Sequence, residues 1–425
     1  MEAILAFGLL IGLILGGMWV QFAVAGAGLT YIWLLKGFGG WKALGLVSWG
    51  AANSFTLAAI PLFVLMAEIL LGSGLSTRLY NGVAPFMRRL PGGLLHTNIA
   101  GSGIFAAISG GSAPTAAAMS TVALPELSAR GYNKRLVAGS LAAGGTLGIL
   151  IPPSITMIIY GVLSGASIGQ LFLAGIMPGI GIASGLLIYA SWRAKRDGFP
   201  VTPRMTGRER LAATRRTLPA LLLPLIILVG IKAGIFTPTE AAAVAVGYAL
   251  IIGFVYRDLT LTRVWDALIA TALVSTSILF ITSMASIVSF VFTLEQVPQL
   301  IADAMLSLTE NPWMILLLLN IFLLVLGMFL EPISILILTM PILMKFQALI
   351  GMDPVQFGTV VVLNVVIGMA TPPVGILLFI ASAISGEPVG KVIREAIPLV
   401  GICLLVLAVI ALVPQVSLFF PSFLN

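Results

Sequence analysis

The sequence predicts an all-α protein that crosses a membrane many times and contains two related halves of opposite orientation. Three observations support this: apolar segments recur along the whole chain, two of them carry the same double proline, and basic residues cluster in a few short segments. Hydrophobic residues make up 59% of the 425 positions, and charged residues make up only 9%. Because about 20 apolar residues span a bilayer as a helix, we expect roughly ten to twelve such segments.

Other classes of protein fit the composition less well. The chain lacks the alternating pattern of about ten residues that marks strands of an outer-membrane barrel. No basic residue precedes the apolar run within the first 20 residues, so this run is expected to be a membrane helix rather than a cleaved signal peptide. The net charge of +7 reflects basic loops and not nucleic-acid binding. The lone Cys403 and the lone His96 exclude a disulfide, a thiolate cluster and a zinc site built from these residue types.

Two apolar segments are interrupted by the same double proline. "GILIPPSITMIIYG" (148–161) contains Pro152–Pro153, and "GMATPPVGILLF" (368–379) contains Pro372–Pro373, so the offset is 372 − 152 = 220. A proline inside a helix removes a backbone hydrogen bond and costs about 3 kcal/mol. At this offset Gly148 aligns with Gly368, and Gly131 aligns with Gly351. The repeat predicts two broken helices, at about 131–163 and about 351–381.

A second kind of break precedes each broken helix. "SGGSAPTAAAMSTVALPEL" (109–127) and "LGMFLEPISILILTMPIL" (326–343) both hold a proline-containing cluster that another proline follows. The 14 residues before the first cluster are too short to cross a bilayer. We therefore expect re-entrant helical hairpins at about 95–127 and at about 313–347. The second hairpin depends on the repeat, because Trp313–Leu330 could span the membrane alone.

Positive charge predicts the orientation of the halves. The base of the first hairpin (128–135) holds three basic residues, whereas the matching stretch of the second (345–355) holds Lys345 and Asp353. Basic loops stay in the cytoplasm, so the halves are expected to be inverted, as in secondary transporters. The predicted organisation is a first repeat (1–192), a basic cytoplasmic linker (193–217) that lies along anionic headgroups, and a second repeat (218–425).

Broken helices expose carbonyl oxygens on one stub and amides on the other. The carbonyls suit a small cation, and the amides suit an anionic group of a substrate. Serine and threonine side chains flank the breaks, and no acidic residue lies at the first one, so we expect Na⁺ rather than Ca²⁺ or Mg²⁺. Glu331 is the acidic residue predicted at membrane depth. It could bind or steer a cation, carry a proton, or cap the following helix.

Five stretches together resemble the large membrane subunit of tripartite ATP-independent periplasmic (TRAP) transporters, over nearly the whole chain. They are "ANSFTLAAIPLFVLMAEILLGSGLS" (52–76), "SGGSAPTAAAMS", "GTLGILIPPSITMIIYG", "LGMFLEPISILILTMPIL" and "GMATPPVGILLF". The resemblance implies a multi-pass inner-membrane protein that uses a Na⁺ gradient to import an organic acid. It also implies an elevator motion, a periplasmic substrate-binding protein and a small four-helix membrane subunit, which we expect to be a separate chain.

The resemblance also assigns roles to residues of this sequence. It implies two or more Na⁺ ions and a substrate between the hairpin tips. For the cation sites it implies Ser109, Gly111, Ser112, Gly148, Ile151, Pro153, Gly327, Gly368, Thr371 and Val374. For the substrate it implies Thr115, Ser154, Glu331 and Pro373. The first tip reads "SGGS", where many members have a Gly-Ser-Ser order, so Gly111 offers only its carbonyl.

Three alternatives remain at this stage. The nearest is a self-sufficient Na⁺/dicarboxylate symporter or a cation/proton antiporter of related inverted-hairpin fold, which needs no binding protein. A membrane-embedded enzyme would need a nucleophilic or acid–base constellation at depth, which the sequence lacks, so no enzyme activity is expected. A channel could also be lined by opposed re-entrant tips. The sequence does not identify the organic acid.

Overall fold

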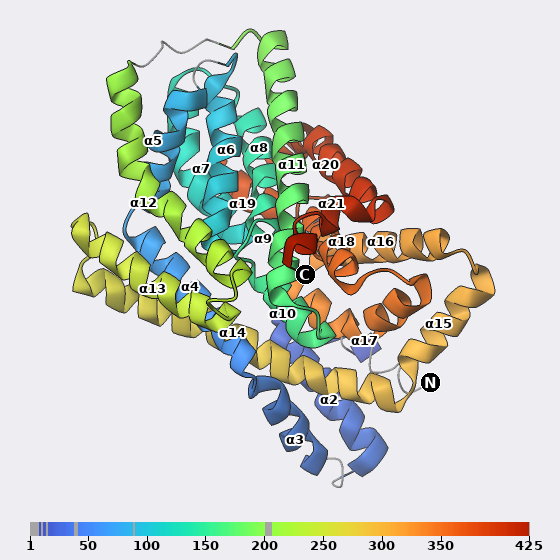
Figure 1. Ribbon diagram of the computed structural model, residues 1–425. Coiled ribbons are helices and arrows are strands. Elements are labelled where there is room, and N and C mark those ends of the chain that lie inside the picture. The colour runs from blue at the N-terminus through green and yellow to red at the C-terminus, as the bar shows by residue number, and fades with distance from the viewer. Residues whose placement is uncertain are drawn as a thin grey trace.

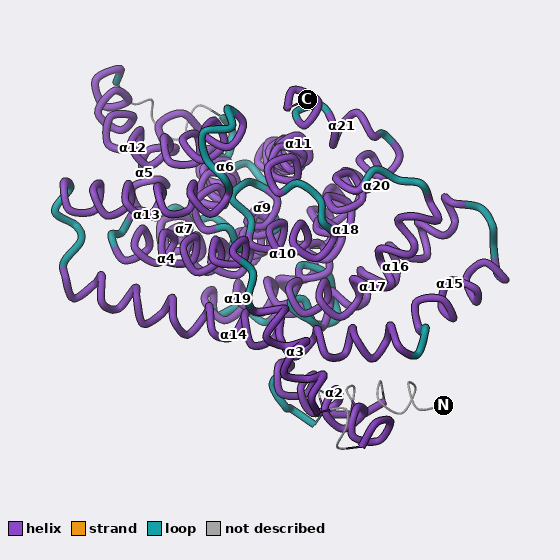
Figure 2. The backbone as a smooth tube through the Cα atoms, turned by 60° about the horizontal axis from the view of Figure 1, so that its bottom comes forward, coloured by secondary structure: helices purple, strands orange, loops and turns teal. Residues whose placement is uncertain are grey.

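The computed structural model describes residues 8–9, 12–13, 16–37, 41–87, 90–199 and 206–424. Most of the first membrane helix expected near the N-terminus lies outside these residues, and so does part of the basic linker, including Arg204. Over the described ranges the regular secondary structure is entirely helical (Figure 2).

Eleven helical elements precede the basic segment in the described chain. They are α2 (Val20–Lys36), α3 (Trp41–Ala52), the 3₁₀ turn η2 (Phe55–Ala58), α4 (Ala59–Gly72), α5 (Leu75–Met87), α6 (Gly93–Ser109), α7 (Ser112–Ala129), α8 (Lys134–Gly145), α9 (Leu147–Leu150), α10 (Ile155–Ser164) and α11 (Ile168–Arg196). The elements that follow are α12 (Gly207–Lys232), α13 (Pro238–Val255), α14 (Leu261–Leu294), α15 (Val297–Leu308), α16 (Pro312–Phe329), α17 (Pro332–Ile350), α18 (Pro354–Met369), α19 (Ile376–Ser385), α20 (Val389–Leu412), α21 (Pro414–Leu418) and the 3₁₀ turn η3 (Pro421–Leu424).

Fewer helices of the described chain than the expected ten to twelve segments are long enough to cross a membrane. Seven helices of the described chain are long and apolar enough to cross a membrane, or up to eight if a bent pair counts as one span. Five more apolar helices have only 10–17 residues, and α18 and α19 are two of them. The difference arises because prolines and glycines divide several apolar runs into pieces shorter than the bilayer.

Helix α14 is the longest element, with 34 residues. At about 1.5 Å per residue it is about 50 Å long, well beyond the roughly 30 Å of a hydrocarbon core. It runs across the lower part of the molecule in Figure 1 and packs against α2, α3, α4 and α17. Helices close to the N-terminus and α17 therefore pack against the same long helix.

Each predicted hairpin corresponds to two helices joined by two residues. Helix α6 ends where Gly110 takes a left-handed conformation (φ 62°), and the extended Gly111 is the N-cap of α7. An L-residue with a side chain rarely adopts such a positive φ, so glycine makes this tight turn possible. Leu330 and Glu331 join α16 to α17, and the two helices pack against each other. The observed pairs lie within two or three residues of the predicted bounds.

Both double prolines lie where a helix is interrupted. Helix α9 stops at Leu150, and α10 begins after Ser154, whose hydroxyl oxygen accepts a hydrogen bond from the Met157 amide at 3.2 Å. The two stubs of this pair are bent by 41°. In the second case α18 stops at Met369, and α19 begins after Gly375 (φ 62°). The inverted-repeat domain bounds themselves stay a prediction, but the breaks occur where the repeat placed them.

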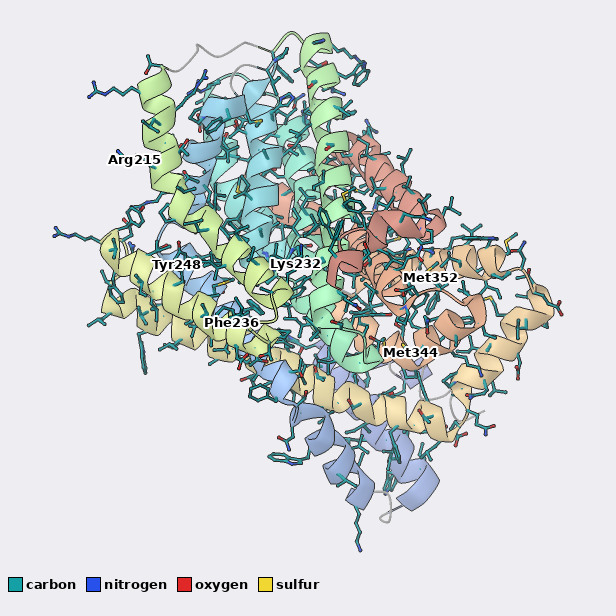
Figure 3. All side chains as sticks on the ribbon, viewed as in Figure 1. Arg215, Lys232, Phe236, Tyr248, Met344 and Met352 are labelled. Carbon is teal, nitrogen blue, oxygen red and sulfur yellow. The ribbon has the colours of Figure 1, made fainter. Side chains whose placement is uncertain are left out.

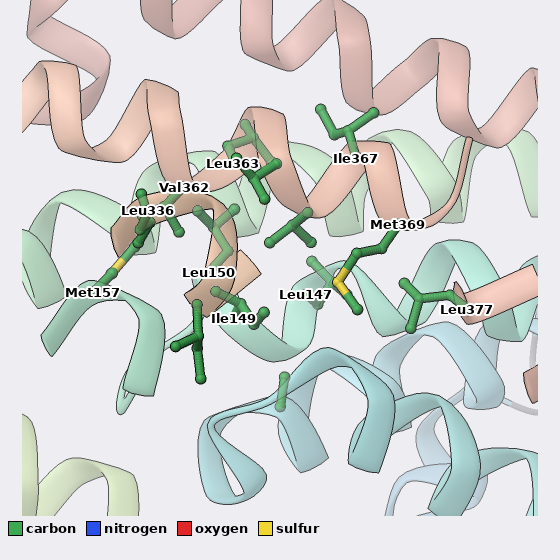
Figure 4. Packing of buried hydrophobic residues seen from close by; sticks show 14 of the residues in the cluster. Leu147, Ile149, Leu150, Met157, Leu336, Val362, Leu363, Ile367, Met369 and Leu377 are labelled. Carbon is green, nitrogen blue, oxygen red and sulfur yellow. The ribbon is translucent and has the colours of Figure 1, made fainter. Parts of the chain in front are cut away.

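The stubs of the two broken helices share one apolar core (Figure 4). Leu147, Ile149, Leu150 and Met157 surround the first break, and they lie close to Leu336, Val362, Leu363, Ile367, Met369 and Leu377 of the C-terminal part. Helix α19 packs against α7 and α8, and α10 packs against α17 and α18. The C-terminal piece of each broken helix, α10 or α19, thus contacts the hairpin of the other part of the chain.

Charged pairs occur near helix ends rather than within the core. Arg135 at the start of α8 binds Glu387 at 3.0 Å, and Arg193 near the end of α11 binds Glu395 of α20 at 3.2 Å. Figure 3 places Arg215 and Lys232 near opposite ends of α12. His96 is fully buried and connects α6 to α11 through Nε2 and the Ser191 hydroxyl at 2.8 Å.

Candidate functional site

The first candidate site is built by the α6–α7 turn and the first helix break. Gly148 lies so close to the Gly111 carbonyl that a Cβ atom there would be 2.7 Å from the Gly111 carbonyl carbon. A Cβ atom on Gly110 would be 2.8 Å from the Pro153 carbonyl oxygen. The Ile155 amide donates to the Gly110 carbonyl at 3.4 Å. The structure therefore brings the hairpin turn and the break into backbone contact.

A hydroxyl pair closes the same turn. Ser109 Oγ lies 2.6 Å from Thr115 Oγ1, and Thr115 Oγ1 donates to the Gly111 carbonyl at 2.8 Å. The Thr115 side chain is fully buried. We predicted Thr115 as a substrate contact, but its hydroxyl holds the Gly111 carbonyl and the Ser109 hydroxyl in place. The spacing of four residues between Gly111 and Thr115, which permits this bond within one helical turn, was the signal in the sequence.

Free oxygen atoms remain around this turn. Pro152 has no N–H to donate to the Gly148 carbonyl four residues earlier, so that carbonyl lacks its normal helical partner. The Ser112 hydroxyl is buried, with 1% of the residue exposed, and makes no hydrogen bond within the described chain. Buried polar groups normally have a partner. Neutral carbonyl and hydroxyl oxygens of this kind can act as ligands for a monovalent cation.

The second candidate site is built by α16 and the second break. Gly327 and Gly368 touch, and a Cβ atom on Gly368 would be 2.6 Å from Gly327 Cα. The Thr371 amide donates to the Gly368 carbonyl at 2.9 Å, and the Thr371 hydroxyl donates to the Ile367 carbonyl at 2.7 Å. The Gly375 amide donates to the Met328 carbonyl at 3.0 Å. The break is thereby attached to the end of α16, as the first break is attached to the α6–α7 turn.

Other predicted site residues lie outside these contacts. The Ile151 side chain packs near Gly103 and Gly179. Ser154 caps α10, as described above. Pro373 is exposed, and Val374 is partly exposed. Among the described residues, no group of three or more histidine, cysteine or acidic side chains could hold a metal ion.

Glu331 faces a cavity of about 490 Å³ between α2, α14 and the start of α17. It occupies the N-cap position of α17, but its side chain makes no capping hydrogen bond. The cavity is lined by Trp19, Gln21, Leu273, Val274, Ser277, Ile278, Ile281, Glu331, Ile333 and Ser334. Among the described residues of this lining, Glu331 is the one that carries a charge. The side-chain cap that we considered for Glu331 is therefore not formed.

The same cavity reaches the N-terminus of α17. Pro332 has no N–H, and the first intrahelical bond is the one that Ile335 donates to the Glu331 carbonyl at 3.1 Å. The amides of Ile333 and Ser334 thus belong to the first turn, whose N–H groups have no partner within the helix. They carry the positive end of the helix dipole, which favours an anion. The sequence did not predict the wall that α2 and α14 contribute.

The hydroxyl of Thr115 should contribute strongly to stability. Replacement by valine removes this partner from the buried Ser109 hydroxyl and from the partly buried Gly111 carbonyl, which keeps only weaker donors such as the Thr115 amide at 3.3 Å, a loss of about 1–3 kcal/mol. We expect Thr115→Val to lower the free energy of unfolding by about that amount, while Thr115→Ser keeps most of it. Thermal unfolding of the two variants measures the difference. A valine variant as stable as the serine variant would show that the hydroxyl pair is unimportant.

Comparison with known proteins gives a consistent result. The family described as "Tripartite ATP-independent periplasmic transporter, DctM component" matches residues 7–416. The C4-dicarboxylate TRAP transporter large permease protein DctM of Pseudomonas aeruginosa is 39% identical over 387 residues, which cover 90% of this chain and 90% of that protein. The sialic acid TRAP transporter large permease protein SiaM of Vibrio cholerae is 34% identical over 414 residues, with 97% and 96% covered.

A third relative and one solved structure extend the comparison. The isethionate TRAP transporter permease protein DctMQ of Oleidesulfovibrio alaskensis is 38% identical over 376 residues, which cover 88% of this chain and 59% of that protein. The crystal structure of the YdaH transporter of Alcanivorax borkumensis superposes with a TM-score of 0.62 at 16% identity, covering 92% of this chain and 90% of that one. At this identity the likeness concerns the fold alone.

Proposed function

The chain belongs to the DctM component family of TRAP transporters, whose members are inner-membrane large permeases. We propose that it imports an organic acid, that a Na⁺ gradient drives the import, and that the transport domain moves as an elevator. The family implies a small membrane subunit and a periplasmic binding protein as partners. It is a family of transporter permeases rather than of enzymes. The relatives named above carry C4-dicarboxylate, sialic acid or isethionate in their names, so a carboxylate or sulfonate is the proposed substrate class.

The observation that best supports import of an anion is the cavity at the start of α17. Ile333 and Ser334, whose amides are uncapped, line a space of about 490 Å³, and no basic side chain of the described residues lines it. A helix N-terminus attracts an anionic group without a cationic side chain. We infer that the carboxylate or sulfonate of the substrate is held there, between the hairpin tip and the helices α2 and α14.

Na⁺ coupling is supported by the two backbone cages. We propose that the first cage consists of Ser109, Gly111, Ser112, Gly148, Ile151 and Pro153, and the second of Gly327, Gly368, Thr371 and Val374, although Ile151 and Val374 lie outside the contacts described above. Both are rich in carbonyl and hydroxyl oxygens and hold no carboxylate, which suits Na⁺ better than a divalent cation. Bound Na⁺ would bring positive charge to the hairpin tips, where Glu331 and an anionic substrate would otherwise repel each other.

Elevator motion follows as a proposal from the way the elements pack. The hairpins and broken helices contact one another across the chain, and α2, α3 and α4 pack against the long helix α14, which also contacts α17 of the second hairpin. The first group would move as one body and the second would stay with the small subunit. We propose the small subunit as a separate polypeptide of about four helices.

Uptake by proteoliposomes tests the proposed function. The chain is reconstituted with its small subunit, and labelled organic acids are added together with the cognate binding protein. We expect uptake only with an inward Na⁺ gradient and the binding protein, and at least about a tenfold loss when K⁺ replaces Na⁺. Uptake by this chain alone would favour a self-sufficient symporter. Uptake driven by protons without Na⁺ would argue against the cages and point to Glu331.

A further inference from the structure

A second cavity, separate from the α17 cavity, lies among α16, α18 and α20. Its volume is about 310 Å³, in the range of ligand pockets. It is lined by Trp313, Leu316, Leu317, Asn320, Ile321, Leu324, Asn364, Leu404, Leu407, Ala408, Ala411 and Leu412. Trp313, Leu317 and Leu412 are each more than half exposed. On membrane helices such exposed apolar residues face lipid, so the cavity opens toward the bilayer.

Two asparagines form the polar part of the cavity. Asn364 Nδ2 donates to Asn320 Oδ1 at 2.6 Å and to the Asn320 carbonyl at 3.0 Å. Asn320 Nδ2 donates in turn to the Leu316 carbonyl at 2.7 Å. Because Asn364 faces two oxygen acceptors, its amide nitrogen must point toward Asn320. The hydrogen bonds therefore fix which end of the Asn364 amide is the nitrogen and which is the oxygen.

The remaining atom of this pair is an acceptor without a partner. Asn364 is 1% exposed, and its Oδ1 makes no hydrogen bond within the described chain. Leaving a buried carbonyl oxygen unpaired is costly, so a bound molecule is expected to donate to it. The other lining residues are apolar, and none is charged. The complementary molecule is therefore uncharged and apolar, and it carries one hydrogen-bond donor.

We propose that this cavity binds an uncharged single-chain amphiphile from the membrane, with its hydroxyl on Asn364 Oδ1 and its chain leaving between α16 and α20. The cavity volume equals about ten water molecules at about 30 Å³ each, which leaves room for a short part of such a chain. An ion or an organic acid would find no charge to balance its own.

The cavity is adjacent to the second cage. Asn364 lies one helical turn before Gly368 on α18, and a Cβ atom on Gly368 would be 2.9 Å from the carbonyl of Leu324, which lines the cavity. A ligand that separates α16 from α18 would loosen the contact between Gly327 and Gly368. An effect on Na⁺ dependence rests on the proposed function, whereas binding itself does not.

Binding is tested with two probes that differ only in the donor, 1-decanol and n-decane. The full chain with its small subunit is held in lipid nanodiscs, and thermal unfolding is followed as each probe is added. We expect decanol to produce half of its effect on Tm at a concentration about five- to tenfold lower than decane, because decane cannot bond to Asn364. Equal behaviour of the two probes would overturn the proposal.

Two matched variants locate the effect. Ala408→Trp fills the cavity from α20 and should remove the difference between the probes. Leu405→Trp lies on the same helix, is 65% exposed and does not line the cavity, so it should keep the difference. If the difference survives Ala408→Trp, the hydroxyl binds elsewhere and the proposal fails. Asn364→Leu provides a second reading, since it should make decanol and decane equivalent.

The effect of the bound amphiphile on transport is measured separately. Decanol, but not decane, should raise the Na⁺ concentration needed for half-maximal uptake, and Ala408→Trp should remove this effect. If decanol binds by the unfolding assay but leaves Na⁺ dependence unchanged, the binding site stands and the link to the second cage is wrong.

Discussion

Gly148→Ala and Gly368→Ala are each expected to reduce Na⁺-dependent uptake by more than about tenfold. The added methyl group at position 148 would be 2.7 Å from both the Gly111 carbonyl carbon and Thr115 Oγ1, and at position 368 it would be 2.6 Å from Gly327 Cα. Most of these neighbours are backbone atoms, which cannot rotate away. Overpacking of this kind costs about 1–3 kcal/mol. The measurement is uptake together with the rise in Tm that Na⁺ produces.

A control glycine separates this clash from a general effect of alanine. Gly401 lies within α20, and a Cβ atom there would have no neighbour within 4 Å. Alanine is a better helix former than glycine, so Gly401→Ala should preserve uptake and raise stability by about 0.5–1 kcal/mol. If Gly148→Ala and Gly368→Ala behave like Gly401→Ala, the close contacts at the cages are not needed for transport.

Glu331→Gln is expected to lower uptake by about tenfold or more and to raise the Na⁺ concentration for half-maximal uptake. Glu331 is the one charged group lining the α17 cavity, and its side chain makes no capping bond. An unpaired carboxylate at membrane depth is costly and is retained where a cation neutralises it during the cycle. Glutamine keeps the size of the side chain but removes this attraction. Na⁺ titration of uptake at saturating substrate measures the change.

The conservative variant decides what the carboxylate does. Glu331→Asp keeps the charge and should retain Na⁺ dependence close to that of the unchanged protein. If Glu331→Gln instead leaves the response to Na⁺ unchanged and lowers the KM for the organic acid, the prediction is wrong. Glu331 would then repel the substrate and would not support cation binding.

Features that depend on local spacing were predictable from the sequence. The double prolines placed both breaks because proline lacks an N–H wherever it occurs. The two glycines at 110 and 111 placed the first turn because glycine adopts the left-handed conformation of position 110, which ends α6, more readily than other residues. The family also followed from such stretches, and comparison with known proteins confirms it. In each case the decisive interaction lies within a few residues of the chain.

Features that depend on packing between distant segments were not predictable. Neither the wall that Gln21 and Ser277 contribute to the cavity at Glu331 nor the pairing of Asn320 with Asn364 follows from local spacing. Their signal was limited to a polar residue within an apolar run. The hydrogen bond from Thr115 to the Gly111 carbonyl was not predicted, and the role of Thr115 in substrate binding stays a prediction. Composition does not show where a helix stops, so fewer described helices than expected are long enough to cross a membrane.

The exchange of stubs between the two parts of the chain has a consequence for biogenesis. Helix α10 packs against α17 and α18, which are synthesised some 170 residues later, and α19 packs against α7 and α8, which were synthesised long before. When the N-terminal part enters the membrane, α10 therefore has no contact with α17 and α18, which have not yet been synthesised. The packing around the first break can be completed only after α17 and α18 have been inserted, so folding of this region ends later than its insertion.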